Sequence, residues 1–126
     1  MHEQVGLLAY SPLAQGTLTG KYLGGQMPQG SRLALFGDGP LMMRYKGDKT
    51  QQAIEMYVNL AKKYEIDPAQ LAIQFCNIQP FVTSTIIGAT TMEQLKTCID
   101  SVDLDITKEI MNEIRGIHKE IPNPAP

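Results

Sequence analysis

The sequence has 126 residues, of which 43% are hydrophobic, and a formal net charge of -2. This length suits one domain with a hydrophobic core, and the apolar content excludes a disordered chain. The charges are interspersed and no apolar run reaches the roughly 20 residues that span a bilayer, so we expect no nucleic-acid or membrane partner. No cluster of ligating side chains is apparent in the sequence, so we expect no metal either. Cys76 and Cys98 are too far apart for a CxxC pair, and no secretory signal is recognisable, which predicts reduced thiols in a cytoplasmic protein.

The first predicted element is a strand over residues 5–11. Val5, Leu7 and Leu8 follow one another with almost no polar interruption, which is typical of a strand buried on both faces of a parallel sheet. Pro12 cannot donate to a strand ladder and should end the pairing. The loop that follows leaves the carboxyl end of a strand, where α/β folds place their ligand sites.

Residues 12–48 are predicted to form one long loop. Glycine and proline recur from residue 24 to residue 47 without sustained periodicity, and structureless segments of this length are usually functional or mobile. Arg32 lies in the middle of the segment. It is either a solvated surface charge or part of a lid whose guanidinium reaches a phosphate.

Two helices are predicted over residues 49–79. Residues 50–64 carry apolar side chains at helical spacing, and Asp67 followed by Pro68 is typical of an N-cap and a first helical position. Cys76 falls on the apolar stripe of the second helix and is interpreted as a core residue.

A second buried strand is predicted over residues 83–88, with helices over residues 91–118. Thr91 with Gln94, or Thr90 with Glu93, fits a capping box at the start of the first of these helices. These threonines either only cap the helix or also help its N-terminus to bind an anion.

The last helix is predicted from about residue 107 to residue 117, with Ile110, Ile114 and Ile117 on one face. His118 should follow its final turn, and residues 119–126 should form a tail over the surface. The order of strands and helices predicts an α/β fold with two parallel strands. No catalytic residue or ligand cluster emerges from the local patterns.

Four segments, taken together and in order, resemble the carboxyl-terminal part of the aldo-keto reductase family: AYSPLAQGTLTGKY, SR, DPAQLAIQF and STIIGATTMEQLKTCID. The resemblance covers essentially the whole chain. It implies a TIM (β/α)8 barrel that reduces carbonyls with NADP(H), in which the two strands resemble the seventh and the eighth.

The resemblance also implies which residues bind the cofactor. Tyr10 matches the aromatic residue that stacks on the nicotinamide, Lys21 and Arg32 match the basic pair at the phosphates, and Cys98 stands where the family often has an asparagine against the adenine. The other implied contacts fall into two groups. The first comprises Ser11, Pro12, Leu13, Ala14 and Gln15, and the second, for the 2′-phosphate and adenine, comprises Gly88, Ala89, Thr90, Thr91 and Gln94.

The family's catalytic tetrad lies on the first four barrel strands, which have no counterpart in this sequence. We therefore expect a truncated chain that is inactive alone, and that self-associates or pairs with a missing N-terminal part. Two alternatives are a non-enzymatic nucleotide-binding or interaction module and a structural barrel remnant whose cofactor residues are idle.

Overall fold

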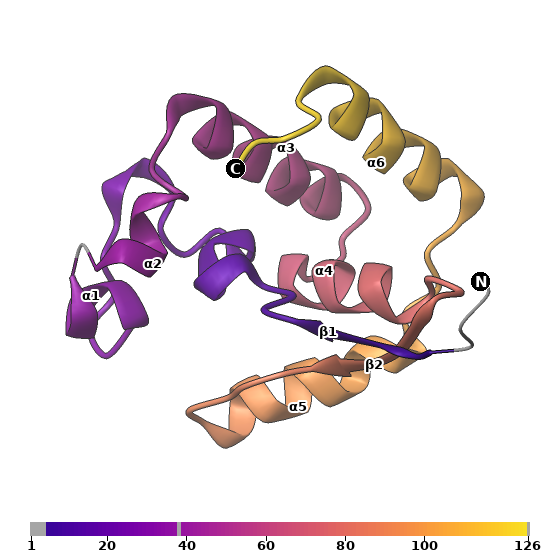
Figure 1. The fold of residues 1–126 in the computed structure, drawn as a ribbon, viewed down its shortest axis with the longest axis horizontal. Coiled ribbons are helices and arrows are strands. Elements are labelled where there is room, and N and C mark those ends of the chain that lie inside the picture. The colour runs from indigo at the N-terminus through magenta and orange to yellow at the C-terminus, as the bar shows by residue number, and fades with distance from the viewer. Residues whose placement is uncertain (1–4, 38, 126) are drawn as a thin grey trace.

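The computed structural model describes residues 5–37 and 39–125, which form a small α/β fold (Figure 1). Strands and α-helices follow one another in the order β1 (Leu7–Tyr10), α1 (Arg32–Phe36), α2 (Pro40–Met43), α3 (Asp48–Lys63), α4 (Pro68–Asn77), β2 (Val82–Ile86), α5 (Met92–Asp100) and α6 (Lys108–Glu120). Three short 3-10 helices complete the described chain: η1 (Ala14–Thr19), η2 (Leu23–Gly25) and η3 (Ser101–Asp103).

The two strands pair in parallel, as predicted. Leu7 lies opposite Val82 and Tyr10 opposite Ile86, and α3 and α4 form the connection between the strands. β1 lies within its predicted range of residues 5–11. β2 spans residues 82–86, whereas residues 83–88 were predicted. In the view of Figure 1, α4 lies above the strands and α5 below them.

The prediction that both strands are buried on both faces is wrong for this chain. Leu7 is 47% exposed, Leu8 60% and Ile86 51%. Two short strands offer little surface for covering elements, and α4 is the helix with the most extensive contact to β2. The strands therefore have the apolar composition that is typical of a sheet covered by helices, but many of their apolar side chains are exposed to solvent.

The core lies between α3, α4 and α6. Its buried residues come from all three helices and comprise Leu60, Ala61, Leu71, Ile110, Ile114 and Ile117. The amphipathic spacing of these helices was predicted, and burial of the isoleucine stripe of α6 is confirmed. Asp67 caps α4 as predicted, since its carboxylate accepts from the backbone N–H of Ala69 at 2.7 Å.

A small polar cluster also joins α3 to α6. The Lys63 ammonium donates to Glu113 Oε1 at 2.8 Å, and the Tyr64 hydroxyl donates to the same oxygen. The hydrogen bond from Lys63, followed by that from Tyr64, lowers the pKa of Glu113. The same hydrogen bond to Glu113 raises the pKa of Tyr64. Glu113 is therefore held as a carboxylate that joins the middle of α6 to the carboxyl-terminal end of α3.

The segment predicted as one long loop contains short helices, which corrects that interpretation. Ser31 caps α1 by accepting from the N–H of Ala34 at 3.3 Å, and Pro40 opens α2 at its first turn. Helices of five and four residues are too short to produce a detectable 3.6-residue periodicity.

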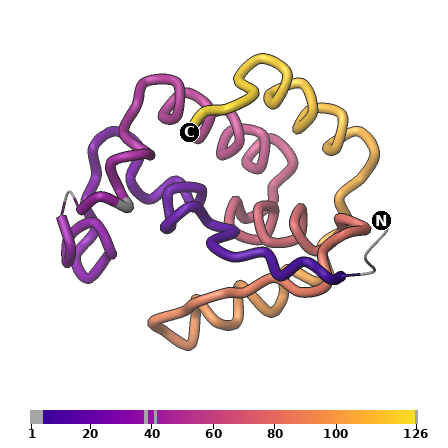
Figure 2. Tube along the Cα trace, in the orientation of Figure 1, coloured from indigo at the N-terminus to yellow at the C-terminus, as the bar shows by residue number. Residues whose placement is uncertain are grey.

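The carboxyl-terminal tail is anchored, which also differs from the prediction. α6 continues through His118 to Glu120, and Ile121 is buried. The tail then turns back across α3 toward the segment between α2 and α3, as the trace in Figure 2 shows. There Arg44 Nη2 donates to the carbonyl of Ala125 at 2.7 Å and Thr50 Oγ1 donates to the carbonyl of Pro124. Backbone acceptors carry no composition signal, so the sequence did not reveal these contacts.

Across the described parts of the chain, no helix combines the length and the apolar character that crossing a membrane would need.

We predict that Gly20→Ala lowers the free energy of unfolding by roughly 2–3 kcal/mol. Gly20 has φ +80°, and an added Cβ would lie 3.1 and 3.2 Å from the two methyl carbons of buried Val58. Left-handed strain costs about 1 kcal/mol and crowding a buried side chain costs more. Gly24, with φ +69° and open space around it, is the matched control, and Gly24→Ala should cost only about 1 kcal/mol. Equal losses in urea titrations of the two variants would show that contact with Val58 is unimportant.

Candidate functional site

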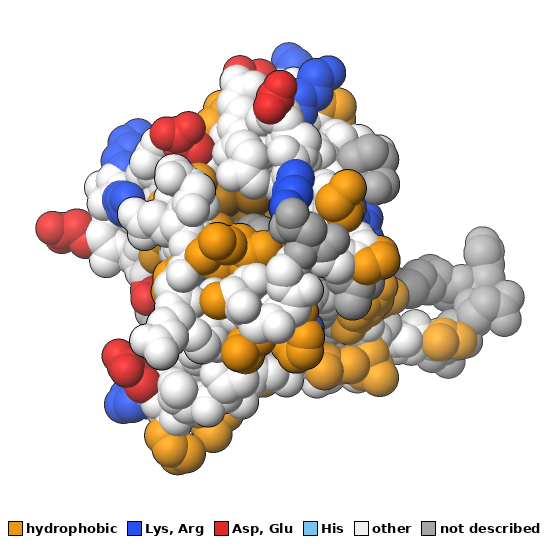
Figure 3. Space-filling view, turned by 90° about the vertical axis from the view of Figure 1, so that its left-hand side faces the viewer, with side chains coloured by type: hydrophobic (Ala, Val, Ile, Leu, Met, Phe, Trp, Pro, Cys, Tyr) orange, Lys and Arg blue, Asp and Glu red, His pale blue; other side chains and the backbone are white. Residues whose placement is uncertain are grey.

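The parallel pairing brings two predicted ligand-binding segments to one edge of the sheet. Tyr10 and Ile86 are the paired last residues of β1 and β2, so the loops that follow both strands leave from the same edge. Figure 3 shows the molecule from the side toward which both strands run in Figure 1. Apolar side chains gather in the middle of this face, and charged side chains lie mainly toward its rim.

The backbone after β1 turns sharply. Ser11, Ala14 and Gln15 adopt positive φ angles of 54°, 48° and 60°, which is uncommon for residues other than glycine. The N–H of Ala14 donates to the carbonyl of Ser11 at 2.9 Å, and that of Gly16 to the carbonyl of Leu13 at 2.8 Å. Such conformations cost of order 1 kcal/mol each and cluster at ligand sites, so this turn is a candidate binding loop.

Tyr10 presents its ring at the end of β1. The side chain is 78% exposed, whereas Pro12 and Leu13 beside it are half-buried. An exposed aromatic face at a strand's carboxyl end is available for stacking against a planar ring.

Tyr22 links the two predicted phosphate-binding cations. The Lys21 ammonium lies 5.1 Å from the centre of the Tyr22 ring, and the Tyr22 hydroxyl accepts from the N–H of Leu33 at 3.4 Å. Leu33 adjoins Arg32 in the first turn of α1. The buried Tyr22 therefore ties the loop that carries Lys21 to the helix that carries Arg32. Sequence reasoning missed this role, since nothing local distinguishes Tyr22 from the other tyrosines.

A cavity of about 230 Å³ brings Gln15 and Arg32 together. Phe36 and Met42 form part of its apolar wall, and the Arg32 guanidinium carbon lies 6.0 Å from the centre of the Phe36 ring. Sequence reasoning did not single out Phe36 or Met42. The N-cap at Ser31 and the proline at the start of α2 were the local signals for the helices that carry them.

The second predicted group lies at the start of α5. The N–H of Gln94 donates to Thr91 Oγ1 at 3.2 Å, and Gln94 Oε1 accepts from both the N–H and the hydroxyl of Thr90 at 3.0 Å. The capping register that starts at Thr91 is thus the one present. Gly88, Ala89 and these three side chains are all exposed. Because Thr91 uses an oxygen lone pair for the cap, its hydroxyl proton remains able to donate to an anion.

Cys98, near the carboxyl-terminal end of α5, is buried. Desolvation, followed by the charge of Asp67, raises the pKa of its thiol, so it stays neutral. The side chain is a packing residue in this structure and is not presented to the surface on which Thr90 and Thr91 lie.

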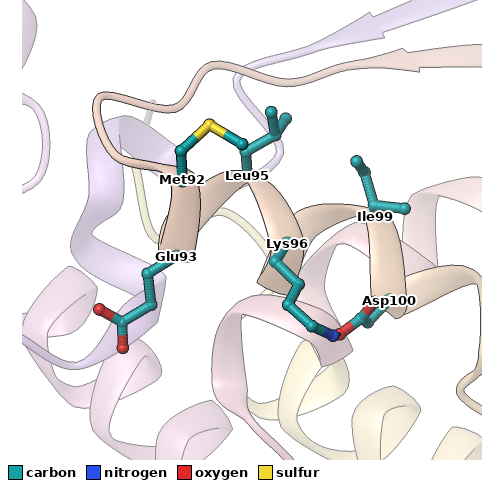
Figure 4. Close-up of a pocket in the computed structure, with 6 residues that line it drawn as sticks. All are labelled: Met92, Glu93, Leu95, Lys96, Ile99 and Asp100. Atoms are coloured by element: carbon teal, nitrogen blue, oxygen red, sulfur yellow. The ribbon is translucent and has the colours of Figure 1, made fainter.

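A separate hollow of about 580 Å³ lies along α5. Figure 4 shows Met92, Leu95 and Ile99 pointing to one side of the helix, toward the strands, and the charged side chains of this helix pointing to the other side. Met92 and Ile99 are 78% and 56% exposed. This apolar face adds to the uncovered surface of the strands.

Comparisons with known proteins decide the family. The sequence model of the aldo/keto reductase family matches residues 1–119. The chain belongs to the aldo/keto reductase family. It is 49% identical over 125 residues to the protein Tas of Escherichia coli K12, with 99% of this chain and 35% of Tas covered.

Two further relatives carry more specific names. The chain is 35% identical over 120 residues to a probable voltage-gated potassium channel subunit beta of Oryza sativa subsp. japonica, covering 94% of this chain and 37% of the relative. It is 34% identical over 101 residues to L-glyceraldehyde 3-phosphate reductase of Escherichia coli, covering 79% and 29%. The chain thus spans about a third of the length of these relatives.

We predict that Thr91→Ala lowers the free energy of unfolding by about 1 kcal/mol, because α5 loses its side-chain cap. Thr91→Asn should restore most of the loss, since asparagine caps equally well. Thr107 caps α6 by accepting from the N–H of Ile110 at 3.3 Å, so Thr107→Ala is a matched control with a similar expected cost. Urea denaturation measures all three, and an unchanged stability for Thr91→Ala alone would contradict the capping role.

Proposed function

We propose that the chain is the NADP(H)-binding carboxyl-terminal part of an aldo/keto reductase barrel, with β1 and β2 as its seventh and eighth strands. The observation that carries the proposal is the parallel register of Tyr10 with Ile86. It brings the loop after β1 and the start of α5 to one edge, which an extended dinucleotide can follow. Family membership makes NADP(H) the ligand to expect there.

The residues present fit such a cofactor. The exposed ring of Tyr10 can stack on a nicotinamide, and the turn at residues 11–15 supplies backbone groups beside it. The cations of Lys21 and Arg32 suit the phosphates, because charge-assisted hydrogen bonds to phosphate are among the stronger contacts that proteins make.

The start of α5 suits the 2′-phosphate. The first turn of a helix leaves N–H groups without intrahelical acceptors, at the positive end of the helix dipole, and the hydroxyl of Thr91 adds a donor. Glu93 contributes a negative charge to the same turn. The phosphate would therefore have to bind on the side of the turn away from that carboxylate.

In the reaction we propose, bound NADPH supplies a hydride to a carbonyl carbon. The residues of this chain bind and orient the cofactor, and none of them is assigned a catalytic role. The proton donor would come from the first four strands of the barrel. Aldehydes or ketones are the substrate class, in line with the name of the relative L-glyceraldehyde 3-phosphate reductase.

The exposed strands support the second part of the proposal, that further barrel strands pair with this chain. Leu8 and Ile86 expose more than half of their surface, and Met92 and Ile99 of α5 do so as well. Burying such side chains stabilises an assembly by about 25 cal/mol per Å² of apolar area. Where those strands are not supplied, self-association of the chain would cover the same surface.

A non-enzymatic nucleotide-binding module is the second candidate function. It is favoured by the similarity to a protein named as a probable potassium channel subunit beta. Both functions require the cofactor to bind, and they differ in whether turnover follows.

We predict that NADPH raises the thermal unfolding temperature of the purified chain and that NADH does so less. A ligand at about a hundredfold excess over its Kd stabilises the native state by about 2.7 kcal/mol. Lys21→Ala or Arg32→Ala should weaken NADPH binding by roughly tenfold or more, since each removes one charge-assisted contact. Lys62→Ala and Arg115→Ala, which remove exposed charges on α3 and α6, are the matched controls.

Equal stabilisation by both nucleotides would contradict a site for the 2′-phosphate. No stabilisation by either would contradict a cofactor site formed by this chain alone. The oligomeric mass, measured on the same samples, reports whether the exposed strands drive self-association.

A further inference from the structure

The contacts of the carboxyl-terminal tail suggest a role in positioning the proposed site. We propose that residues 121–125 form a strap that fixes α1 and α2 over the loop after β1, with Arg44 and Thr50 as the positioning residues. The inference rests on the proposed function for its ligand, and on the contacts of the tail alone for its mechanics.

The helices α1 and α2 form a lid on the cavity that contains Gln15. Arg32, Phe36 and Met42 of this lid line the cavity, and Gln15 is contributed by the loop after β1. Any shift of the two helices would therefore change the distance between the guanidinium of Arg32 and that loop. The position of the lid decides whether the candidate phosphate-binding groups converge.

The chain leading into the lid offers little restraint. Gly24, Gly25 and Gly30 all have positive φ angles, and an added Cβ at any of them would meet nothing within 4 Å. Segments rich in such open glycines bend at low cost. Near its first residues, the lid is held by the hydrogen bond from the N–H of Leu33 to the Tyr22 hydroxyl, which is long at 3.4 Å.

The tail holds the other end of the lid. Arg44, the C-cap of α2, donates from Nη2 to the carbonyl of Ala125 at 2.7 Å. Thr50 is 4% exposed in the first turn of α3 and donates to the carbonyl of Pro124. Its hydroxyl also lies 3.5 Å from the carbonyl of Arg44, so one buried threonine meets both the tail and the end of the lid.

The tail itself has a firm base. Ile121 is 7% exposed directly after α6, and its N–H donates to the carbonyl of Ile117 at 2.9 Å. α6 is part of the core that it forms with α3 and α4. The strap thus connects the most buried part of the molecule to the end of a lid whose other connection is glycine-rich.

Hydrogen exchange of the ligand-free chain tests the mechanics without any cofactor. Thr50→Val keeps the shape of a buried side chain but removes the hydroxyl, and a chain ending at Ile121 removes both carbonyl acceptors. For Thr50→Val we expect peptides covering α1 and α2 to exchange about five- to tenfold faster, the change that losing one hydrogen bond produces. The shortened chain loses the bonds of both Arg44 and Thr50, so its lid should exchange at least as fast. Exchange in α4 should stay unchanged. Arg115→Ala, which removes a cation outside both the tail and the lid, is the control for Arg44→Ala.

Two results would overturn the strap: unchanged exchange in α1 and α2, or faster exchange of the same size in α4, which would indicate general loss of stability. Arg44→Ala should reproduce the effect of Thr50→Val, and Arg44→Lys, which keeps a donor, should restore slow exchange in part. A failed restoration would contradict Arg44 as the positioning residue.

Titration with NADPH separates the strap from the proposed function. If both hold, Thr50→Val weakens NADPH binding by about the factor by which lid exchange accelerates. Faster lid exchange with no NADPH binding by any variant would support the strap and contradict the proposed function. Unchanged lid exchange with normal NADPH binding would contradict the strap and leave the proposed function standing.

Discussion

The parallel pairing of β1 with β2 is the constraint on which the candidate site depends. Because Tyr10 and Ile86 end their strands side by side, the loop after β1 and the start of α5 leave from one edge. An antiparallel pair would place these segments at opposite edges. Parallel pairing requires a long crossover, and α3 and α4 provide it while forming the core with α6.

The helices α3, α4 and α6 pack into a well-buried core, whereas much of the surface of the two strands is exposed to solvent. The core of α3, α4 and α6 buries the isoleucines of α6, whereas Leu8 and Ile86 on the strands stay largely exposed. The site residues themselves lie in short helices and turns at the open edge. A fold of this kind has a stable base, while its ligand-binding groups depend on a few hydrogen bonds for their position.

The sequence predicted the elements with strong local signals. The N-cap at Asp67 and the isoleucine spacing of α6 could be recognised because capping and helical periodicity act within a few residues. The exposure of the strands could not, since it depends on which elements cover a sheet. The contacts of Arg44 and Thr50 to the tail join residues 81 and 74 positions apart through backbone carbonyls, which leave no trace in composition.

The most direct test of the account is a two-dimensional amide NMR titration of the isotope-labelled chain with NADPH. If the strand register forms a single cofactor site, amide resonances of Ser11, of residues 13–15, of Arg32 and of Thr90–Thr91 should shift together with one apparent Kd, while those of the core residues Leu71 and Ile114 remain fixed. Shifts confined to one of the two loops, or shifts with clearly different Kd values, would contradict a single site at this edge.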